Sequence, residues 1–319
     1  MTRRFDVTAL GELLIDFTDS GLSPARMQLF ERNPGGAPAN VLAALARFGH
    51  QTAFLGKVGA DMHGDFLRDT LMTAGIDVRG LVSDPEVFTT LAFVALDPGG
   101  ERSFSFARKP GADTCLRPEE LDCQRLRDTR VLHIGSLSMT QEPVRSATVA
   151  AVHIARDAGA VISYDPNYRA SLWPSREAAE EQMRRLARQA DLIKLSDQET
   201  ELLTGERGPR QAALALRRQG AACVAVTLGP EGALVAAGDG VVHVPGFAVT
   251  AVDTTGAGDA FWGGFLHRFL TLNVHPSELT ADRAADCARW GNAVAACCIR
   301  KRGAIPAMPS LREAEQMLG

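Results

Sequence analysis

The sequence of 319 residues lacks long hydrophobic runs and blocks of one charge. No apolar stretch approaches the roughly 20 residues that a membrane-spanning helix needs, and the first residues carry no apolar segment typical of a signal peptide. No long block of lysine and arginine stands out, and the net charge is −4. Neither nucleic acid nor a membrane is therefore expected as a partner, and we expect a cytoplasmic protein.

The sequence also lacks the spacings of common metal and catalytic motifs. Its six cysteines are scattered apart from Cys297-Cys298 and are expected to be reduced thiols. None of the seven histidines has the spacing of a zinc site, so each is expected at the surface or as a satisfied core residue. A P-loop ending in Gly-Lys-Ser/Thr, the His-Arg-Asp and Asp-Phe-Gly motifs of protein kinases and a Gly-x-Ser-x-Gly motif are all missing. Any phosphate chemistry therefore needs another scaffold.

What is present is an alternation of β-rich apolar segments and helical periodicity, in a chain that is 45% hydrophobic and 23% charged. Strands are predicted at residues 6–10, 53–58, 131–135, 160–164, 192–195 and 223–227. Helices are predicted at residues 38–48, 65–74, 144–158, 176–189 and 209–219. This alternation indicates an α/β fold with a mainly parallel sheet covered on both faces. Ligands of such sheets bind at the carboxyl ends of the strands.

Two segments, 13–19 and 89–107, break the alternation and are expected to form antiparallel strands. The residues Asp97-Pro98-Gly99-Gly100-Glu101 predict a turn between strands at 90–96 and 102–106. No helices follow these strands, so they are expected to form a small separate sheet, either a lid over a site or an edge hairpin without function. Another hairpin is predicted at 233–237 and 241–244. We expect one domain over residues 1–319, with a lid at about 12–33 and 86–110.

The segment Asp253-Thr254-Thr255-Gly256-Ala257-Gly258-Asp259 precedes an apolar run and predicts a helix that begins near residues 256–259. A glycine-rich turn at a helix start presents unpaired N–H groups and the positive end of the helix dipole, which together attract phosphate. A carboxylate there would repel phosphate unless it has a task, and the removal of a proton from an attacking hydroxyl is such a task. The alternative is an ordinary helix start with Asp259 as a favourable dipole partner.

Two more motifs suit a polyol. Asp16 follows the first strand, where it either accepts hydrogen bonds from neighbouring sugar hydroxyls or satisfies a local turn. Gly35 and Gly36 open a helix and let the backbone approach a ligand, and Asn40 offers a donor and an acceptor one turn later. The alternative is a plain loop-to-helix entry. Glu199, after the strand at 192–195, is expected at that strand's carboxyl end.

With these residues in place, the chain resembles the ribokinase-like (PfkB-type) carbohydrate kinases over essentially its whole length. The resemblance rests on two separated signatures in the right order, Gly35-Gly36-Ala37-Pro38-Ala39-Asn40 continuing through residues 56–64, and residues 253–261. It implies a three-layer, Rossmann-like α/β core with a small β lid. It also implies ATP and Mg²⁺ as cofactors and the phosphorylation of a sugar's terminal CH₂OH.

The resemblance assigns roles residue by residue. Asp259 corresponds to the general base and Gly256, Ala257 and Gly258 to the anion hole. The sugar side is matched by Asp16, Gly35, Gly36 and Asn40, with Arg108, Asn167 and Arg169 as further candidates. The nucleotide side is matched by Lys194, Ser196, Glu199, Thr227, Gly229, Gly232 and Asn292. Glu199 corresponds to the acid that organises Mg²⁺ through water, and Ser196 stands where the family usually has Asn.

Members of the family often bind K⁺ beside the anion hole. The matching ligands are the Asp253 carboxylate and the carbonyl oxygens of Thr255, Cys298, Lys301 and Gly303. Ala307 stands where ribokinase-type members have a Ser ligand, which predicts a weakened site. The alternative is that positive charge around Lys301 keeps the ion out.

Within the family, residues 162–169 and 133–138 look most like fructokinases, which implies conversion of D-fructose to fructose 6-phosphate. The alternatives are 2-keto-3-deoxygluconate kinase, another sugar kinase of this type, or a catalytically silent sugar-sensing protein. An exposed lid strand also allows a homodimer through the lid.

Overall fold

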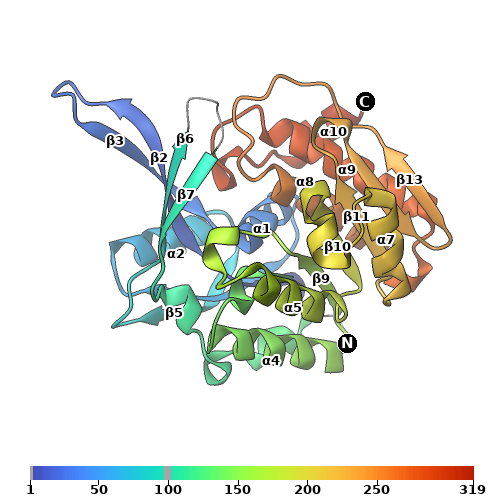
Figure 1. The fold of residues 1–319 in the computed structure, drawn as a ribbon, viewed down its shortest axis with the longest axis horizontal. Coiled ribbons are helices and arrows are strands. Elements are labelled where there is room, and N and C mark those ends of the chain that lie inside the picture. Colours follow the sequence, from blue (N-terminus) through green and yellow to red (C-terminus); the bar gives the residue numbers. More distant parts are fainter. Residues whose placement is uncertain (1–2, 97–101) are drawn as a thin grey trace.

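The computed structural model describes residues 3–96 and 102–319, and a nine-stranded sheet forms its core (Figure 1). The strand order is β13-β12-β11-β10-β9-β8-β1-β4-β5. Every neighbouring pair from β5 to β11 is parallel, and β12 and β13 add an antiparallel hairpin, as predicted. The strands are β1 (Phe5–Leu10), β4 (Thr52–Gly59), β5 (Asp77–Asp84), β8 (Thr129–Gly135), β9 (Val161–Asp165), β10 (Leu192–Ser196), β11 (Cys223–Thr227), β12 (Ala233–Ala237) and β13 (Gly240–Val244).

Helices cover both faces of this sheet. Successive strand residues point to opposite faces, and both faces are apolar, so each must be buried under helices. In β11, Cys223 packs in one hydrophobic cluster and Val224 in the other. The first cluster joins the sheet to α1 (Ala37–Arg47), α2 (Met62–Thr73), α8 (Ala257–Leu272), α9 (Ala281–Cys298) and α10 (Leu311–Leu318). The second joins it to α3 (Cys123–Arg127), α4 (Val144–Asp157), α5 (Arg176–Ala187), α6 (Thr200–Thr204) and α7 (Pro209–Arg218). The predicted three-layer α/β architecture is confirmed.

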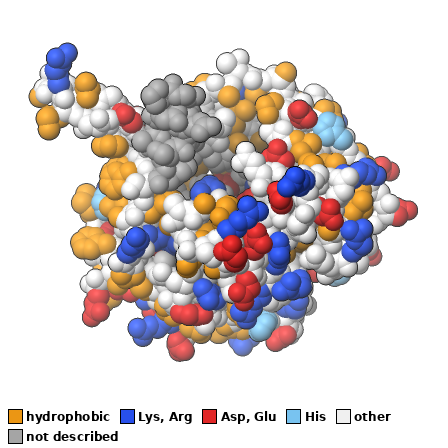
Figure 2. Space-filling view, in the orientation of Figure 1, with side chains coloured by type: hydrophobic (Ala, Val, Ile, Leu, Met, Phe, Trp, Pro, Cys, Tyr) orange, Lys and Arg blue, Asp and Glu red, His pale blue; other side chains and the backbone are white. Residues whose placement is uncertain are grey.

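The second sheet is small and projects from the core at the upper left of Figure 1. Its order is β3-β2-β6-β7, with β2 (Leu14–Leu22), β3 (Gln28–Gly35), β6 (Leu91–Leu96) and β7 (Arg102–Ala107). Hydrophobic side chains lie along this projection (Figure 2). The predicted turn at residues 97–101 lies outside the described residues.

One part of that prediction is wrong, because β2 and β6 pair in parallel rather than antiparallel. The chain returns to the core between them to build α1, β4, α2 and β5. Both strands therefore leave the core in the same direction. The outer pairs, β2 with β3 and β6 with β7, are antiparallel.

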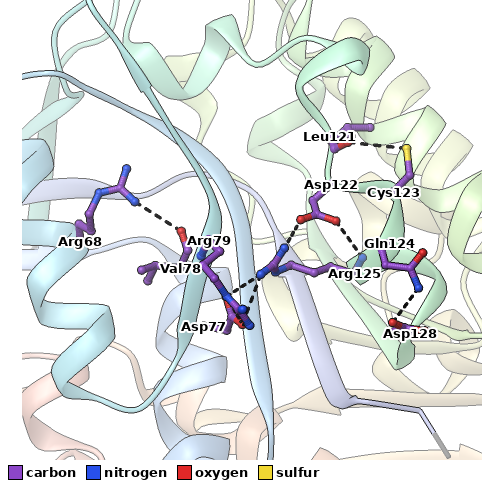
Figure 3. A network of polar contacts seen from close by, with 10 residues as sticks. All are labelled: Arg68, Asp77, Val78, Arg79, Leu121, Asp122, Cys123, Gln124, Arg125 and Asp128. Atoms are coloured by element: carbon purple, nitrogen blue, oxygen red, sulfur yellow. Dashed lines mark hydrogen bonds and ion pairs between the residues drawn. The ribbon is translucent and has the colours of Figure 1, made fainter.

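Ion pairs fasten the edge strand β5 to α3 (Figure 3). The Arg125 guanidinium lies 3.2 Å from the Asp77 carboxylate and also pairs with Asp122. Burial opposes the charge on Asp77, but hydrogen bonds from Arg79 and the charge of Arg125 lower its pKa to about 2. This network is an anchor of the fold and contains none of the predicted site residues.

Among residues 3–96 and 102–319, no helix combines the length and the apolar character that crossing a membrane requires. All six cysteines are free thiols. Buried His133 shares a hydrogen bond with the Ser163 hydroxyl at 3.0 Å, as expected of a satisfied core histidine.

Candidate active site

The predicted catalytic residues lie at the N-terminus of α8, next to Asn40 of α1 and Lys194 of β10. Asn40, in α1, donates from Nδ2 to the Asp259 Oδ2 at 2.7 Å. Asp259 lies 219 residues further along the chain, in the first turn of α8. The structure therefore joins the two family signatures in one contact.

Asp259 is buried, with 7% of its surface exposed. Burial, and then the nearby charge of Asp165, raises its pKa to about 6, although the Asn40 bond and the charge of Lys194 lower it. A carboxylate with this pKa is mostly ionised at pH 7 and is more basic than an ordinary aspartate. Both properties suit a general base.

The turn before α8 leaves two of its three backbone N–H groups without a hydrogen-bond partner in the described residues. Gly256 has φ of 73°, in the left-handed region that favours glycine. The backbone N–H groups of Gly256 and Gly258 have no hydrogen-bond partner within the described parts of the chain. The Ala257 N–H instead donates to the Thr254 carbonyl at 3.2 Å, so it helps to close the turn.

A buried lysine lies against this turn. A Cβ added to Gly258 would stand 2.8 Å from the Lys194 Nζ, so the ammonium group adjoins the Gly258 backbone. Lys194 pairs with the Asp165 carboxylate at 2.8 Å. Burial opposes its charge, but Asp165 and Glu199 raise its pKa, and it stays a cation. The sequence reasoning did not identify Asp165, although it ends strand β9, where ligand-binding residues are common.

The sugar-side candidates lie where the small sheet joins the core. Asp16, on β2, sits so close to Gly35 that any side chain at position 35 would collide with its carboxylate. Gly36 has φ of 124°, and a Cβ there would collide with the Glu12 carbonyl oxygen. A cavity of about 210 Å³ opens beside Asp16, between the small sheet and two loops of the core. Its lining includes Asp16, Thr18 and Asn33 from the sheet and Asp253, Thr255 and Arg302 from the core.

Glu199 connects the segment that follows β9 to the end of β10 through hydrogen bonds. Its Oε1 accepts a hydrogen bond from the Tyr168 N–H at 2.7 Å, and its Oε2 accepts from the Ser196 N–H at 2.7 Å and the Ser196 hydroxyl at 2.9 Å. Ser196 thus binds the glutamate directly. Asn167, beside this junction, has φ of 45° and donates from its backbone to Asp165, and the charge of Arg169 acts on Asp259.

The remaining nucleotide-side candidates lie toward the other edge of the sheet, on β11 to β13 and α9. Thr227 ends β11, and Gly229 and Gly232 turn the chain into β12 with φ of 58° and 97°. Asn292 donates to the carbonyl oxygens of Val244 and Pro245 at 3.1 and 3.0 Å. Asn292 therefore holds the chain that follows β13 against α9.

Arg108 forms a buried ion pair with Asp113 at the base of the small sheet. Its Nε and Nη2 donate to the Asp113 Oδ2 at 2.9 and 2.6 Å, and its other bonds go to Thr140 and to the Leu137 carbonyl. The buried pair supports this junction. Glu12, which the sequence reasoning passed over, lies at the same junction and accepts a hydrogen bond from the Ala37 N–H at 3.0 Å.

The candidate cation loops also come together. The Asp253 Oδ1 accepts from the Thr255 N–H and hydroxyl at 2.9 and 2.7 Å, and its Oδ2 accepts from the Gly303 N–H at 2.9 Å. The Lys301 ammonium pairs with Glu313 at 2.7 Å on the surface. Within the described ranges, no group of three or more His, Cys, Asp or Glu residues is arranged to hold a metal ion directly.

Comparisons with known proteins show which family the chain belongs to. Residues 4–311 match the pfkB family of carbohydrate kinases. Probable fructokinase-2 of Arabidopsis thaliana is 42% identical over 315 residues, which cover 98% of this chain and 95% of that protein. The structure of a fructokinase with bound ATP from Xylella fastidiosa superposes with a TM-score of 0.88 at 33% identity, covering 99% of this chain and 98% of that one.

A double-mutant fructokinase from Vibrio cholerae O395, in its fructose, ADP and potassium ion bound form, also matches with a TM-score of 0.88 at 33% identity, covering all of both chains. The family match and the sequence relative both extend over almost the whole chain, and both signatures meet at Asp259. The chain therefore belongs to the pfkB family of carbohydrate kinases.

Proposed function

We propose that this protein transfers the γ-phosphoryl group of ATP to the 6-hydroxyl of D-fructose, giving fructose 6-phosphate and ADP. The observation that carries the proposal is the buried Asp259 carboxylate, held by Asn40 at the start of α8 beside the Lys194 ammonium. A base, a cation and free backbone N–H groups converge there, as phosphoryl transfer to an alcohol requires. Fructose is the acceptor that the names of the similar proteins favour.

In the proposed reaction, Asp16, Gly35, Gly36 and Asn40 bind the sugar. Asp259 takes the proton of the 6-hydroxyl while that oxygen forms a bond to the γ-phosphorus and the bond to the ADP oxygen breaks. The N–H groups of Gly256 and Gly258, with Lys194, stabilise the negative charge on the transferred group. Because Asp165 holds Lys194 in place, it is a positioning residue. The small sheet is the lid, which excludes water and limits wasteful ATP hydrolysis.

Two ions fit the residues present. Glu199, which joins the segment after β9 to the end of β10, would act on Mg²⁺ through its water shell, the role that the family resemblance gives it. Mg²⁺ would neutralise phosphate charge. The Asp253 carboxylate, with the carbonyl oxygens of Thr255, Cys298, Lys301 and Gly303, would hold K⁺, a hard cation that favours oxygen. Because Lys301 pairs with Glu313 at the surface, its charge need not keep a cation out of this site. Ala307 supplies no further oxygen ligand, so we expect only modest activation by K⁺ over Na⁺.

The structure also bears on the alternatives. 2-Keto-3-deoxygluconate carries a carboxylate, and Arg108, a candidate to bind it, is already neutralised by Asp113. A silent sensor does not need a base with a raised pKa beside an anion turn. Both points favour catalysis on a neutral sugar.

A coupled assay of ADP release tests the proposal across fructose, 2-keto-3-deoxygluconate, ribose, tagatose and adenosine. We expect the highest kcat/KM for fructose, with fructose 6-phosphate identified as the product. A tenfold or greater preference for 2-keto-3-deoxygluconate would overturn the assignment of the acceptor. No turnover with any sugar would overturn the assignment of catalysis.

A further inference from the structure

Glu12 lies at the point where the chain first passes from the core to the small sheet, between β1 and β2. Only 3% of its surface is exposed. Its Oε1 accepts the hydrogen bond from Ala37, the first residue of α1. Its Oε2 is buried and has no hydrogen-bond partner in residues 3–96 and 102–319. A buried carboxyl with one unsatisfied oxygen lowers the stability of the fold, so its presence calls for a functional explanation.

The second passage between sheet and core, from β3 to α1, packs directly on Glu12. Gly36 adopts φ of 124°, and its Cα faces the Glu12 carbonyl oxygen so closely that only glycine fits. The Asn40 N–H donates to the Gly36 carbonyl at 3.0 Å. Glu12 therefore contacts the turn from both its backbone and its side chain, and that turn begins the helix whose Asn40 bonds Asp259.

A third passage, after β7, supplies the charges that act on Glu12. These are Arg108 and Asp113, which are paired with each other. Burial, the largest cause, raises the pKa of Glu12 to about 7, with a further contribution from Asp113 and an opposing one from Arg108. When Glu12 ionises, its Oε2 needs donors. Arg108 is the nearby cation, and it is committed to Asp113. An ionised Glu12 thus either draws Arg108 from Asp113 or admits water to the junction.

We propose that Glu12 is a positioning residue for the acceptor sugar, which in its neutral form holds the Gly35–Gly36 turn and the start of α1 in the sugar-binding geometry. The inference rests on the proposed function. It concerns the sugar side alone, because the nucleotide-side candidates lie on or after β10 to β13 and on α9, and β8 and β9 separate them from β1 and Glu12. Ionisation of Glu12 should weaken sugar binding and leave ATP binding unchanged.

The kinetic test compares wild type with Glu12→Gln, which imitates the neutral acid, and with Glu12→Ala. The control is Glu86→Gln, an exposed carboxyl at another passage between core and sheet. In the wild type and the control, the KM for fructose should rise as the pH rises past about 7, and in Glu12→Gln it should stay flat. Glu12→Ala removes the acceptor for the Ala37 N–H and should raise the KM for fructose roughly tenfold. The KM for ATP should be constant in all four proteins.

A second readout does not depend on activity. A buried acid whose folded pKa is raised, here from 4.5 to about 7, binds its proton more tightly in the folded state. Stability therefore falls as the pH rises between these values. In urea, wild type should lose stability relative to Glu12→Gln from pH 5 to pH 8. Slopes of other groups, Asp259 included, cancel in this difference.

A constant stability difference, or a fructose KM that still rises with pH in Glu12→Gln, would overturn the proposal. Equal changes in the KM values for fructose and ATP would reduce Glu12 to a structural residue and would also overturn it. If wild type phosphorylates no sugar, the proposed function fails, and the stability measurement still decides whether Glu12 carries a proton near neutral pH.

Discussion

At the scale of single residues, the pKa of Asp259 links the structure to measurable kinetics. A base is active only when it is ionised, so kcat/KM should be lost as the pH falls through about 6. Asp259→Asn keeps the size of the side chain and removes the base. We expect kcat to fall about 10²–10⁴-fold, with the acid limb absent from any residual activity. Near-normal kcat in this variant would rule out Asp259 as the base.

The charges around Asp259 allow a sharper test of the same assignment. Asp165 raises its pKa and Lys194 lowers it. Asp165→Asn should therefore move the acid limb of the pH profile to lower pH, and Lys194→Met should move it to higher pH. Urea denaturation of both variants controls for misfolding, because each leaves the other partner buried and unpaired. Shifts in the same direction would mean that another group produces the limb.

At the scale of elements, α1 depends on a glycine at each end for different reasons. Gly49, after its C-terminus, has φ of 86° and open space where a Cβ would stand. Gly36, at its N-terminus, has φ of 124° and no such space. Gly49→Ala should cost only the strain of a left-handed residue, about 1–2 kcal/mol. Gly36→Ala should cost a further ~1–3 kcal/mol from the collision with Glu12.

These free energies of unfolding are measured by urea denaturation. The KM for fructose gives a second comparison of the two variants. Gly36→Ala should raise it because the turn carries the sugar side, whereas Gly49→Ala should leave it unchanged. Equal losses of stability and unchanged fructose KM in both variants would contradict the role given to the Gly35–Gly36 turn.

Elements of the core were predictable because their signals are local. Strand β11 is a short apolar run, helix α4 has helical periodicity, and Gly256, Gly258 and Asp259 lie in one contiguous motif. Strand β3 was not predicted, since its first four residues are all exposed and show no alternation. The parallel pairing of β2 and β6 depends on where the chain re-enters the core, which no local pattern records.

Asp165 and Glu12 were not identified from the sequence because their environment comes from the fold and leaves no local signal. Asp165 and Glu12 are ordinary acids in the sequence, and their properties come from tertiary burial and from Lys194 and Ala37, which are distant in the chain. Arg108 was named only as a further candidate for the sugar side. Its buried partner Asp113 is visible only in the fold.

At the scale of the whole molecule, the small sheet exposes more hydrophobic surface than its own packing explains. Leu22, Met27, Leu29 and Phe30 are 62%, 66%, 44% and 45% exposed, and they lie on or between β2 and β3. Phe30 belongs to an aromatic cluster with Phe17 and Phe93. Strand β3 is also an open edge of its sheet. Open edges and contiguous apolar surface both favour pairing with another chain.

We therefore predict a homodimer formed through the small sheets of two copies. Phe30→Glu places a charge in the apolar surface and should give a monomer in sedimentation experiments at micromolar concentration, where wild type is a dimer. Met72→Glu, at an equally apolar and 57% exposed position on α2 of the core, is the matched control and should remain dimeric. Because β2 carries Asp16, the loss of the partner should also raise the KM for fructose more than the KM for ATP. A monomeric wild type, or a dimeric Phe30→Glu, would show that these hydrophobic residues serve another purpose.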